Sequence, residues 1–248
     1  EITRQGRKEL HALLDWLHEI GVRVVTVSTP YLGAIVQKRH PGTELVVSMF
    51  GGVTSLEMAA KWQALGASAI ILYESKDFPL IRAIAAGTGL EVEITANLWC
   101  MPSCNQRFHH ANVDTASSLE RSPRGEYSLP LCETRCSLEK YAEPRRLLAA
   151  HWMRPEDVGF YEQLGVSRLK VLDRSSTTPF LERALEAYTS RRYDGNLVDL
   201  ILGLHRERYS LPLQPRRLAR LARAFFRPGL LDIARARAFQ RRSQPPRM

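Results

Sequence analysis

The sequence predicts an α/β fold built on parallel strands, with a TIM-like (β/α) barrel as its architecture. Short β-branched runs alternate with amphipathic helical segments through the first hundred residues, and the expected strands begin at residues 22, 45, 69 and 91. Strands that alternate with helices form parallel sheets, because each helix carries the chain back to the same edge. The nearly constant length of these units favours a barrel over a doubly wound sheet. No Gly-rich phosphate-binding fingerprint follows any strand, which also argues against a dinucleotide-binding fold.

The individual elements follow from the apolar pattern. A helix is expected over residues 4–21, since leucines and Ile20 recur on one side of it. Strands are expected at 22–27, 45–48, 69–72, 91–95 and 167–172, with helices at 31–39, 55–65, 78–86, 154–165 and 178–193. Five strands are too few to close an eight-stranded barrel. We therefore expect weak strands within residues 97–150, and we expect that this chain, which starts at Glu1, lacks the first strands of the barrel.

The composition is that of an ordinary globular domain. Hydrophobic residues make up 44% of the chain and charged residues 25%, which excludes disordered, collagen-like and coiled-coil classes. The longest apolar runs are far shorter than the roughly 20 residues of a membrane span, and no leader-like pattern opens the chain. We expect a cytoplasmic protein with a (β/α) domain over residues 1–204.

A strongly basic segment follows this domain. Residues 205–248 contain twelve arginines and two acidic residues, whereas the net charge of the whole chain is +9. We expect a tail of two short helices here. An Arg-rich tail can bind RNA or an acidic partner subunit, and the alternative is a solvated helical face without a ligand.

The cysteines give the most specific chemical signal. Cys100, Cys104, Cys132 and Cys136 form two C-x3-C pairs separated by 27 residues, inside the segment 97–150 that interrupts the strand–helix pattern. Paired cysteines in a reducing compartment indicate a metal site, and the first pair follows a strand end, where parallel α/β proteins place active sites. Four thiolates suit zinc or an iron–sulfur cluster. The C-x3-C spacing is wider than the usual zinc spacing and favours [4Fe-4S]; zinc, disulfides and unligated thiols stay open.

Two longer segments resemble the peptidase U32 family of collagenase-like proteases. They are "EVEITANLWCMPSC" and "HWMRPEDVGFYEQLGVSRLKVLDR", and the resemblance extends over about residues 2–203, closest to a bacterial branch with two C-x3-C pairs. It implies a TIM-like barrel with a [4Fe-4S] cluster on the four cysteines. It also implies one of two activities: oxygen-independent hydroxylation of RNA or a small aromatic substrate, or proteolysis. Asn97 and Asp173 stand where the family usually has glycine, and the first cysteine pair is narrower than usual.

Further site residues are expected around this centre. Lys170 and Arg174 lie an even number of residues apart on the last strand, so both side chains point to one face, where they could bind a carboxylate or phosphate. The alternative for Lys170 is an ion pair with Glu74 at a neighbouring strand end. We expect the catalytic candidates to be Lys170 and Arg174, and the substrate-binding candidates to be Arg154, His109 and His110.

Three functions are therefore considered. The first is an iron–sulfur enzyme of the hydroxylase type, and the second is a peptidase. The third is a non-enzymatic RNA- or partner-binding module with a structural zinc or cluster. The chain contains neither G-x-S-x-G nor H-E-x-x-H, and a site closed by four thiolates has no open position for water. The residues favour the first function.

Overall fold

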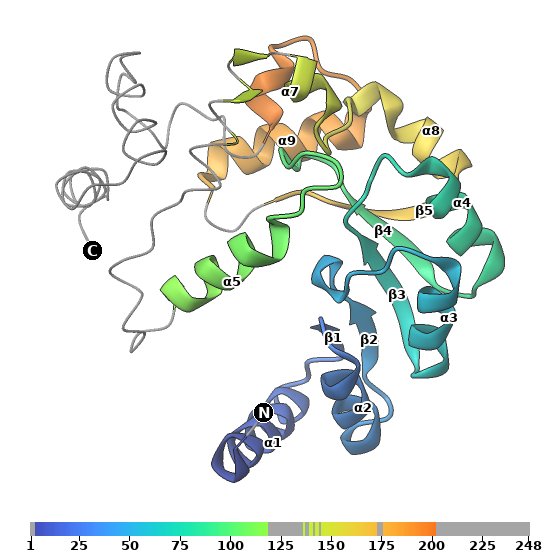
Figure 1. The fold of residues 1–248 in the computed structure, drawn as a ribbon, viewed down its shortest axis with the longest axis vertical. Coiled ribbons are helices and arrows are strands. Elements are labelled where there is room, and N and C mark those ends of the chain that lie inside the picture. Colours follow the sequence, from blue (N-terminus) through green and yellow to red (C-terminus); the bar gives the residue numbers. More distant parts are fainter. Residues whose placement is uncertain are drawn as a thin grey trace, which may run out of the picture.

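A computed structural model describes residues 3–118, 145–172 and 176–201, together with 136, 139–140 and 142–143. Within this part the expected α/β fold is confirmed, as Figure 1 shows. The strands are β1 Val24–Val27, β2 Glu44–Val47, β3 Ala67–Leu72, β4 Glu91–Thr95 and β5 Val166–Lys170. Each strand begins within about two residues of its predicted start, which is the usual uncertainty of an element boundary.

The helices lie between these strands. They are α1 Arg4–Glu19, α2 Pro30–Arg39, α3 Leu56–Ala64, α4 Phe78–Gly87, α5 Arg107–Ser118, α7 Arg145–Ala149, α8 Val158–Gln163 and α9 Thr178–Ser190. Short 3-10 turns occur at Met49–Gly51, Pro155–Asp157 and Leu197–Leu200. The side chains of Thr29, Ser55 and Asp77 accept hydrogen bonds from the first turns of α2, α3 and α4. These N-caps fix the points at which each loop ends and each helix starts.

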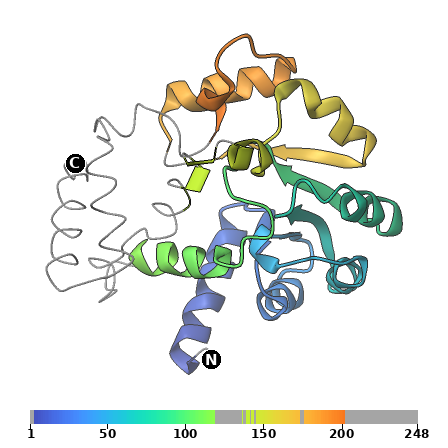
Figure 2. The same ribbon diagram turned by 45° about the horizontal axis from the view of Figure 1, so that its top comes forward.

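The sheet has the strand order β1-β2-β3-β4-β5, and every neighbouring pair is parallel. Because each crossover steps to the next strand in the same direction, the crossover helices gather on one face. Figures 1 and 2 show α2, α3, α4, α8 and α9 outside the curved sheet, with α5 on the opposite side. A doubly wound sheet would reverse its strand order, and the described strands do not. They form a curved, open wall, and a closed barrel is not seen in them.

The segment 97–150 does not supply the extra strands that the sequence suggested, as far as it is described. Its described residues form α5, α7 and one isolated antiparallel bridge between Asn97 and Trp152. The basic tail at 205–248 lies outside the described residues. In the described part of the chain, no helix combines the length and the apolar character needed to cross a membrane.

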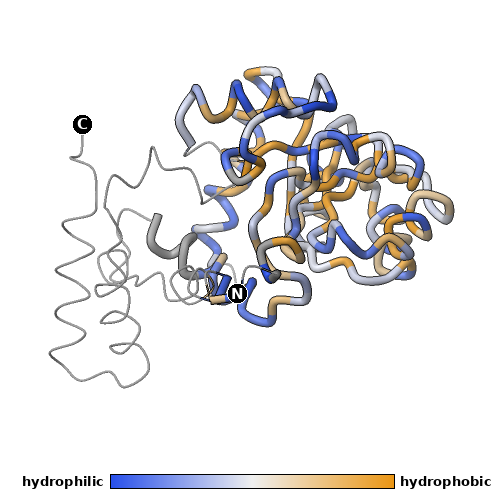
Figure 3. Tube along the Cα trace, turned by 90° about the horizontal axis from the view of Figure 1, so that it is seen from above, coloured by the Kyte–Doolittle hydropathy of each residue, from blue (hydrophilic) through white to orange (hydrophobic). Residues whose placement is uncertain are grey.

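The two faces of the sheet carry different apolar clusters, because successive side chains of a strand point to opposite faces. The main core lies on the helix-covered face and includes Leu45, Ile70 and Ile94, all fully buried. The inner face carries the smaller apolar cluster of Val46, Ala69 and Ile71. Figure 3 shows hydrophobic residues concentrated along the strands, with hydrophilic and hydrophobic residues alternating in the surrounding helices. On the inner face the apolar cluster gives way to charged residues in β4 and β5.

Helix α1 buries less of its apolar side than its sequence pattern suggests. Leu14 is buried, but Leu13, Trp16 and Ile20 are each at least half exposed. The helix is tied to the fold along one narrow side, where Asp15 pairs with Arg39 and His40. β1 is the edge strand of the described sheet, and the side of α1 that carries Leu13, Trp16 and Ile20 stays largely exposed among the described residues.

Candidate metal centre

The centre is built at the carboxyl ends of β3 and β4. Leu72 and Ile94 are paired across these strands, so the residues that follow them emerge side by side. Tyr73 and Glu74 follow β3, and the C-x3-C loop Cys100–Cys104 follows β4. This edge is where parallel α/β folds place binding and catalytic groups, because the loops there are free to vary.

Three of the four predicted cysteine ligands are described. Cys100, Cys104 and Cys136 are half-buried and are not in disulfides. Burial raises the pKa of the Cys100 thiol, and the nearby Cys136 and Cys104 thiols raise it further. Cys132 lies outside the described residues, and within the described ones no three His, Cys, Asp or Glu side chains stand close enough to hold a metal ion.

The C-x3-C loop is held from three directions. The backbone N–H of His151 donates to the Cys100 carbonyl at 2.8 Å, and the Lys140 ammonium donates to the Trp99 carbonyl at 2.6 Å. The N–H of Ser103 donates to both carboxylate oxygens of Glu74, at 3.1 and 3.2 Å. Ser103 itself has a φ of 51°, a left-handed conformation that non-glycine residues seldom adopt. These contacts connect the loop to the loop that follows β3, to Lys140 and to the segment before Trp152.

Glu74 is the hub of the polar contacts. Besides Ser103, its carboxylate receives Arg107 Nη1 at 2.9 Å and lies 3.0 Å from Nε2 of the fully buried His151. The Nε2 contact is close but not aligned as a hydrogen bond. Burial lowers the pKa of His151 to about 4, against the opposing effect of the Glu74 charge, so the ring is neutral at pH 7. The sequence argument considered Lys170 as the partner of Glu74, and that pairing is wrong.

A buried cation lies beside the cysteines. Lys140 is 3% exposed, and its Nζ sits 4.1 Å from the centroid of the Trp99 ring. Its charge lowers the pKa of the Cys100 thiol, opposing the effect of burial. Burying an ammonium group is costly unless anionic groups surround it. A set of thiolates at this position would supply that negative charge.

The remaining predicted site residues are distributed differently. Lys170 ends β5, half-buried, and its charge lowers the pKa of Glu93, whose burial raises it. Arg154 is exposed and forms an ion pair with Asp157 in its own turn. His109 is exposed on α5, and His110 is half-buried beside it. Arg174 lies outside the described residues.

Several residues of the centre have no distinctive motif. Tyr73, Glu74 and His151 come together only through the fold, although His151 stands in the "HWMRPED" segment that carries the family resemblance. Asn97 is fully buried, and its side-chain amide exchanges two hydrogen bonds with the backbone of Leu172, at 2.8 and 2.9 Å. It therefore ties the end of β4 to the end of β5.

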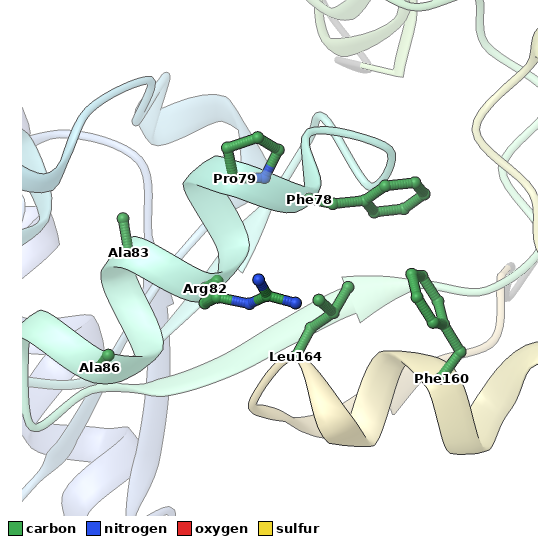
Figure 4. A pocket seen from close by; sticks show the side chains of 7 residues that line it. All are labelled: Phe78, Pro79, Arg82, Ala83, Ala86, Phe160 and Leu164. Atoms are coloured by element: carbon green, nitrogen blue, oxygen red, sulfur yellow. The ribbon is translucent and has the colours of Figure 1, made fainter.

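A separate groove lies in the outer helical layer, between α4 and α8 (Figure 4). Phe78 and Phe160 meet edge to face across it with ring centroids 5.2 Å apart, and Arg82 supplies its charge. Its other lining residues are Pro79, Ala83, Ala86 and Leu164. These side chains include no nucleophile, general base or metal ligand, so the groove is not a catalytic site.

Comparison with known proteins adds three findings. The sequence pattern of "Peptidase family U32" matches residues 2–190. An uncharacterized protease of Methanocaldococcus jannaschii is 28% identical over 203 residues, which is 81% of this chain and 59% of that protein. The solved structure of a U32 peptidase superposes with a TM-score of 0.50 at 21% identity, covering 69% of this chain and 64% of the other. The chain spans about three fifths of the length of the curated relative.

Proposed function

Because this chain belongs to peptidase family U32, we propose that it is an enzyme whose active centre is a [4Fe-4S] cluster held by Cys100, Cys104, Cys132 and Cys136. The proposed chemistry is redox, of the oxygen-independent hydroxylase type, on an RNA or a small aromatic substrate. Zinc is the alternative occupant. The observation that carries the proposal is the buried ammonium group of Lys140, which lies against Trp99 and lowers the pKa of the neighbouring Cys100 thiol.

The residues present fit such a group. A cluster ligated by four thiolates carries net negative charge, which the Lys140 ammonium offsets in surroundings where water cannot. The phenol of Tyr73 is buried and interacts with Cys100, but it has no well-aligned hydrogen-bond partner among the described residues. A buried O–H group in that state calls for an acceptor, and metal-bound sulfur is one.

When bound, the cluster would supply electron transfer or Lewis acidity. The chain's own residues would do the rest. Glu74 holds Arg107 and the cysteine loop in place, and Lys170 offers an ammonium group at the same edge of the sheet for a phosphate or carboxylate. Thr95 pairs with Lys170 across β4 and β5, and its buried hydroxyl lacks a hydrogen-bond partner among the described residues. These groups would orient a polar substrate beside the cysteines.

One observation favours hydrolysis as a second candidate. Ser75 Oγ lies 3.4 Å from Nδ1 of His151, whose Nε2 lies 3.0 Å from Glu74, the order of a nucleophile, a base and an orienting carboxylate. However, Ser75 is 2% exposed and His151 is fully buried, so a peptide has no route to the hydroxyl. The low pKa of His151 also makes it a weak base at pH 7. The redox function is therefore supported better.

The test is anaerobic purification with iron, sulfide and zinc measured per chain, together with a visible spectrum. We expect about four irons and four sulfides, with broad charge-transfer absorption that Cys136→Ala removes and Ser75→Ala keeps. Proteolysis that disappears in Ser75→Ala would instead establish the hydrolase. One zinc without colour would leave a structural site, and salt-sensitive RNA binding lost on deleting 205–248 would then support a binding module.

A further inference from the structure

Tyr73 has a buried hydroxyl that the described fold leaves without a partner. The residue directly follows β3, is 6% exposed, and its Oη forms no well-aligned hydrogen bond with any described residue. Protein folds rarely tolerate a buried O–H in this state unless a ligand or water completes it. By contrast, the hydroxyl of Tyr188, equally buried, donates to the carbonyls of Ala96 and Met153 at 3.1 and 3.0 Å.

The ring of Tyr73 is fixed in its position. The guanidinium of Arg107 stacks over one side at 4.6 Å from the ring centroid, and the His151 ring packs edge-on at 5.3 Å. Both of these neighbours contact the carboxylate of Glu74. If the phenol turned away to find another acceptor, it would disturb Arg107 and His151, and with them the Glu74 carboxylate that also holds Ser103.

The hydroxyl lies beside Cys100 and interacts with it, although not in a well-aligned hydrogen bond. Burial and then the charge of the Cys100 thiol raise the pKa of Tyr73 far above its usual value, with a further contribution from Cys104. A neutral thiol is a weak hydrogen-bond acceptor, whereas sulfur that carries negative charge is a better one. The hydroxyl therefore gains a stronger acceptor when Cys100 is bound to a metal.

We propose that Tyr73 is a positioning residue that donates a hydrogen bond to the sulfur of Cys100 in the metal-bound centre and thereby raises the reduction potential of the cluster. This inference rests on the proposed function. Hydrogen bonds to cluster sulfurs stabilise the reduced state more than the oxidised state, because the reduced state carries more negative charge. In the metal-free protein the neutral Cys100 thiol offers the same hydroxyl only a weak acceptor, so we expect little of the metal-free stability to depend on it.

The experiment compares Tyr73→Phe with Tyr188→Phe in the full chain, each prepared anaerobically with iron and sulfide. The readouts are the iron and sulfide content, the midpoint potential from a redox titration followed by absorbance, and the unfolding temperature without metal. We expect Tyr73→Phe to keep its iron and its metal-free unfolding temperature but to have a more negative potential. Tyr188→Phe should unfold at a lower temperature while its potential matches that of the unaltered chain.

An unchanged potential in fully loaded Tyr73→Phe would overturn the inference, and so would an equal shift in Tyr188→Phe. If the chain binds no iron, the proposed function is refuted. The hydrogen bond to Cys100 can then still be tested in the Co²⁺-bound protein. A displaced sulfur-to-cobalt absorption band in Tyr73→Phe supports the bond, and an identical band overturns it. Failure to bind iron and cobalt alike overturns both ideas.

Discussion

At the scale of single residues, Tyr188 is a buried phenol whose hydroxyl the protein itself satisfies. It bridges the carbonyl that follows β4 and the carbonyl of Met153. Without the hydroxyl, these two buried carbonyl oxygens lose a hydrogen-bond donor. Tyr188→Phe should therefore lower the free energy of unfolding by about 1 to 3 kcal/mol. Urea unfolding of the metal-free protein measures this. Tyr73→Phe is the matched control, and an equal loss in both variants would contradict the difference between the two hydroxyls.

Gly165 is a second residue whose identity the fold requires. It joins α8 to β5 with a φ of +99°, and a Cβ placed there would lie 2.4 Å from the Cβ of Ala85 in α4. Gly165→Ala should therefore lower the free energy of unfolding by at least about 2 kcal/mol, from backbone strain and overpacking together. Gly42→Ala is the control, because a Cβ at Gly42 meets no atom within 4 Å. Similar urea midpoints for the two variants would refute the steric argument.

At the scale of elements, an ion pair joins α1 to α2 in addition to the apolar contacts of Leu14. Arg39, chiefly through its hydrogen bonds, lowers the pKa of Asp15 from 3.8 to about 2, and His40 lies 3.0 Å from the same carboxylate. His18 of α1 also stacks on His40 with ring centroids 4.4 Å apart. Because the folded-state pKa is the lower one, this contribution to stability is complete above pH 3.8 and is lost as the pH falls toward 2.

Asp15→Asn should therefore be less stable than the unaltered chain at neutral pH, and the difference should shrink between pH 4 and pH 2. Thermal unfolding across this range measures it. Glu9→Gln is the control, since Glu9 lies on the same helix and contacts only Gln5 in the hydrogen bonds of the described residues. A difference that stays constant with pH would show that the carboxylate charge of Asp15 is not responsible.

The sequence predicted the elements of the fold better than the contacts between them. Strands and helices were predictable because their signals are local: short β-branched runs for the strands and apolar periodicity for the helices. The buried side of α1 was predicted less well, because periodicity cannot tell whether a neighbouring element is present. The contact of Glu74 with His151 joins residues 77 positions apart, and no local pattern encodes it.

At the scale of the whole molecule, the proposed metal centre links separate parts of the chain. The β4 loop, Lys140, His151 and α5 all meet around Cys100 or Glu74. A group that binds only the folded state stabilises it by mass action, so removing the metal should lower the unfolding temperature by several degrees. Differential scanning calorimetry before and after chelation measures this. Cys136→Ala, which removes a proposed ligand, should respond to the chelator little or not at all.

The sequence located some residues of the proposed site but did not reveal the contacts of others. The placement of Cys100 and Cys104 at a strand end followed from the sequence, because carboxyl ends of parallel strands share an edge. Lys170 lies at the end of β5 but acts on Glu93, which only the register of β4 and β5 reveals. The proposed roles of the site residues all stay predictions, and Arg174 and Cys132 also lie outside the described residues.

The sequential order of the strands has a consequence for the order of folding. β2, β3 and β4 each pair with the strand just before them in the sequence, so this part of the sheet can grow while the chain is being synthesised. β5 must instead close a loop that runs from Thr95 to Val166 before it can pair with β4. That loop contains all four cysteines. Docking of β5 is therefore the natural late step of folding, and a metal bound between the two cysteine pairs would shorten the loop and bring β5 to its edge sooner.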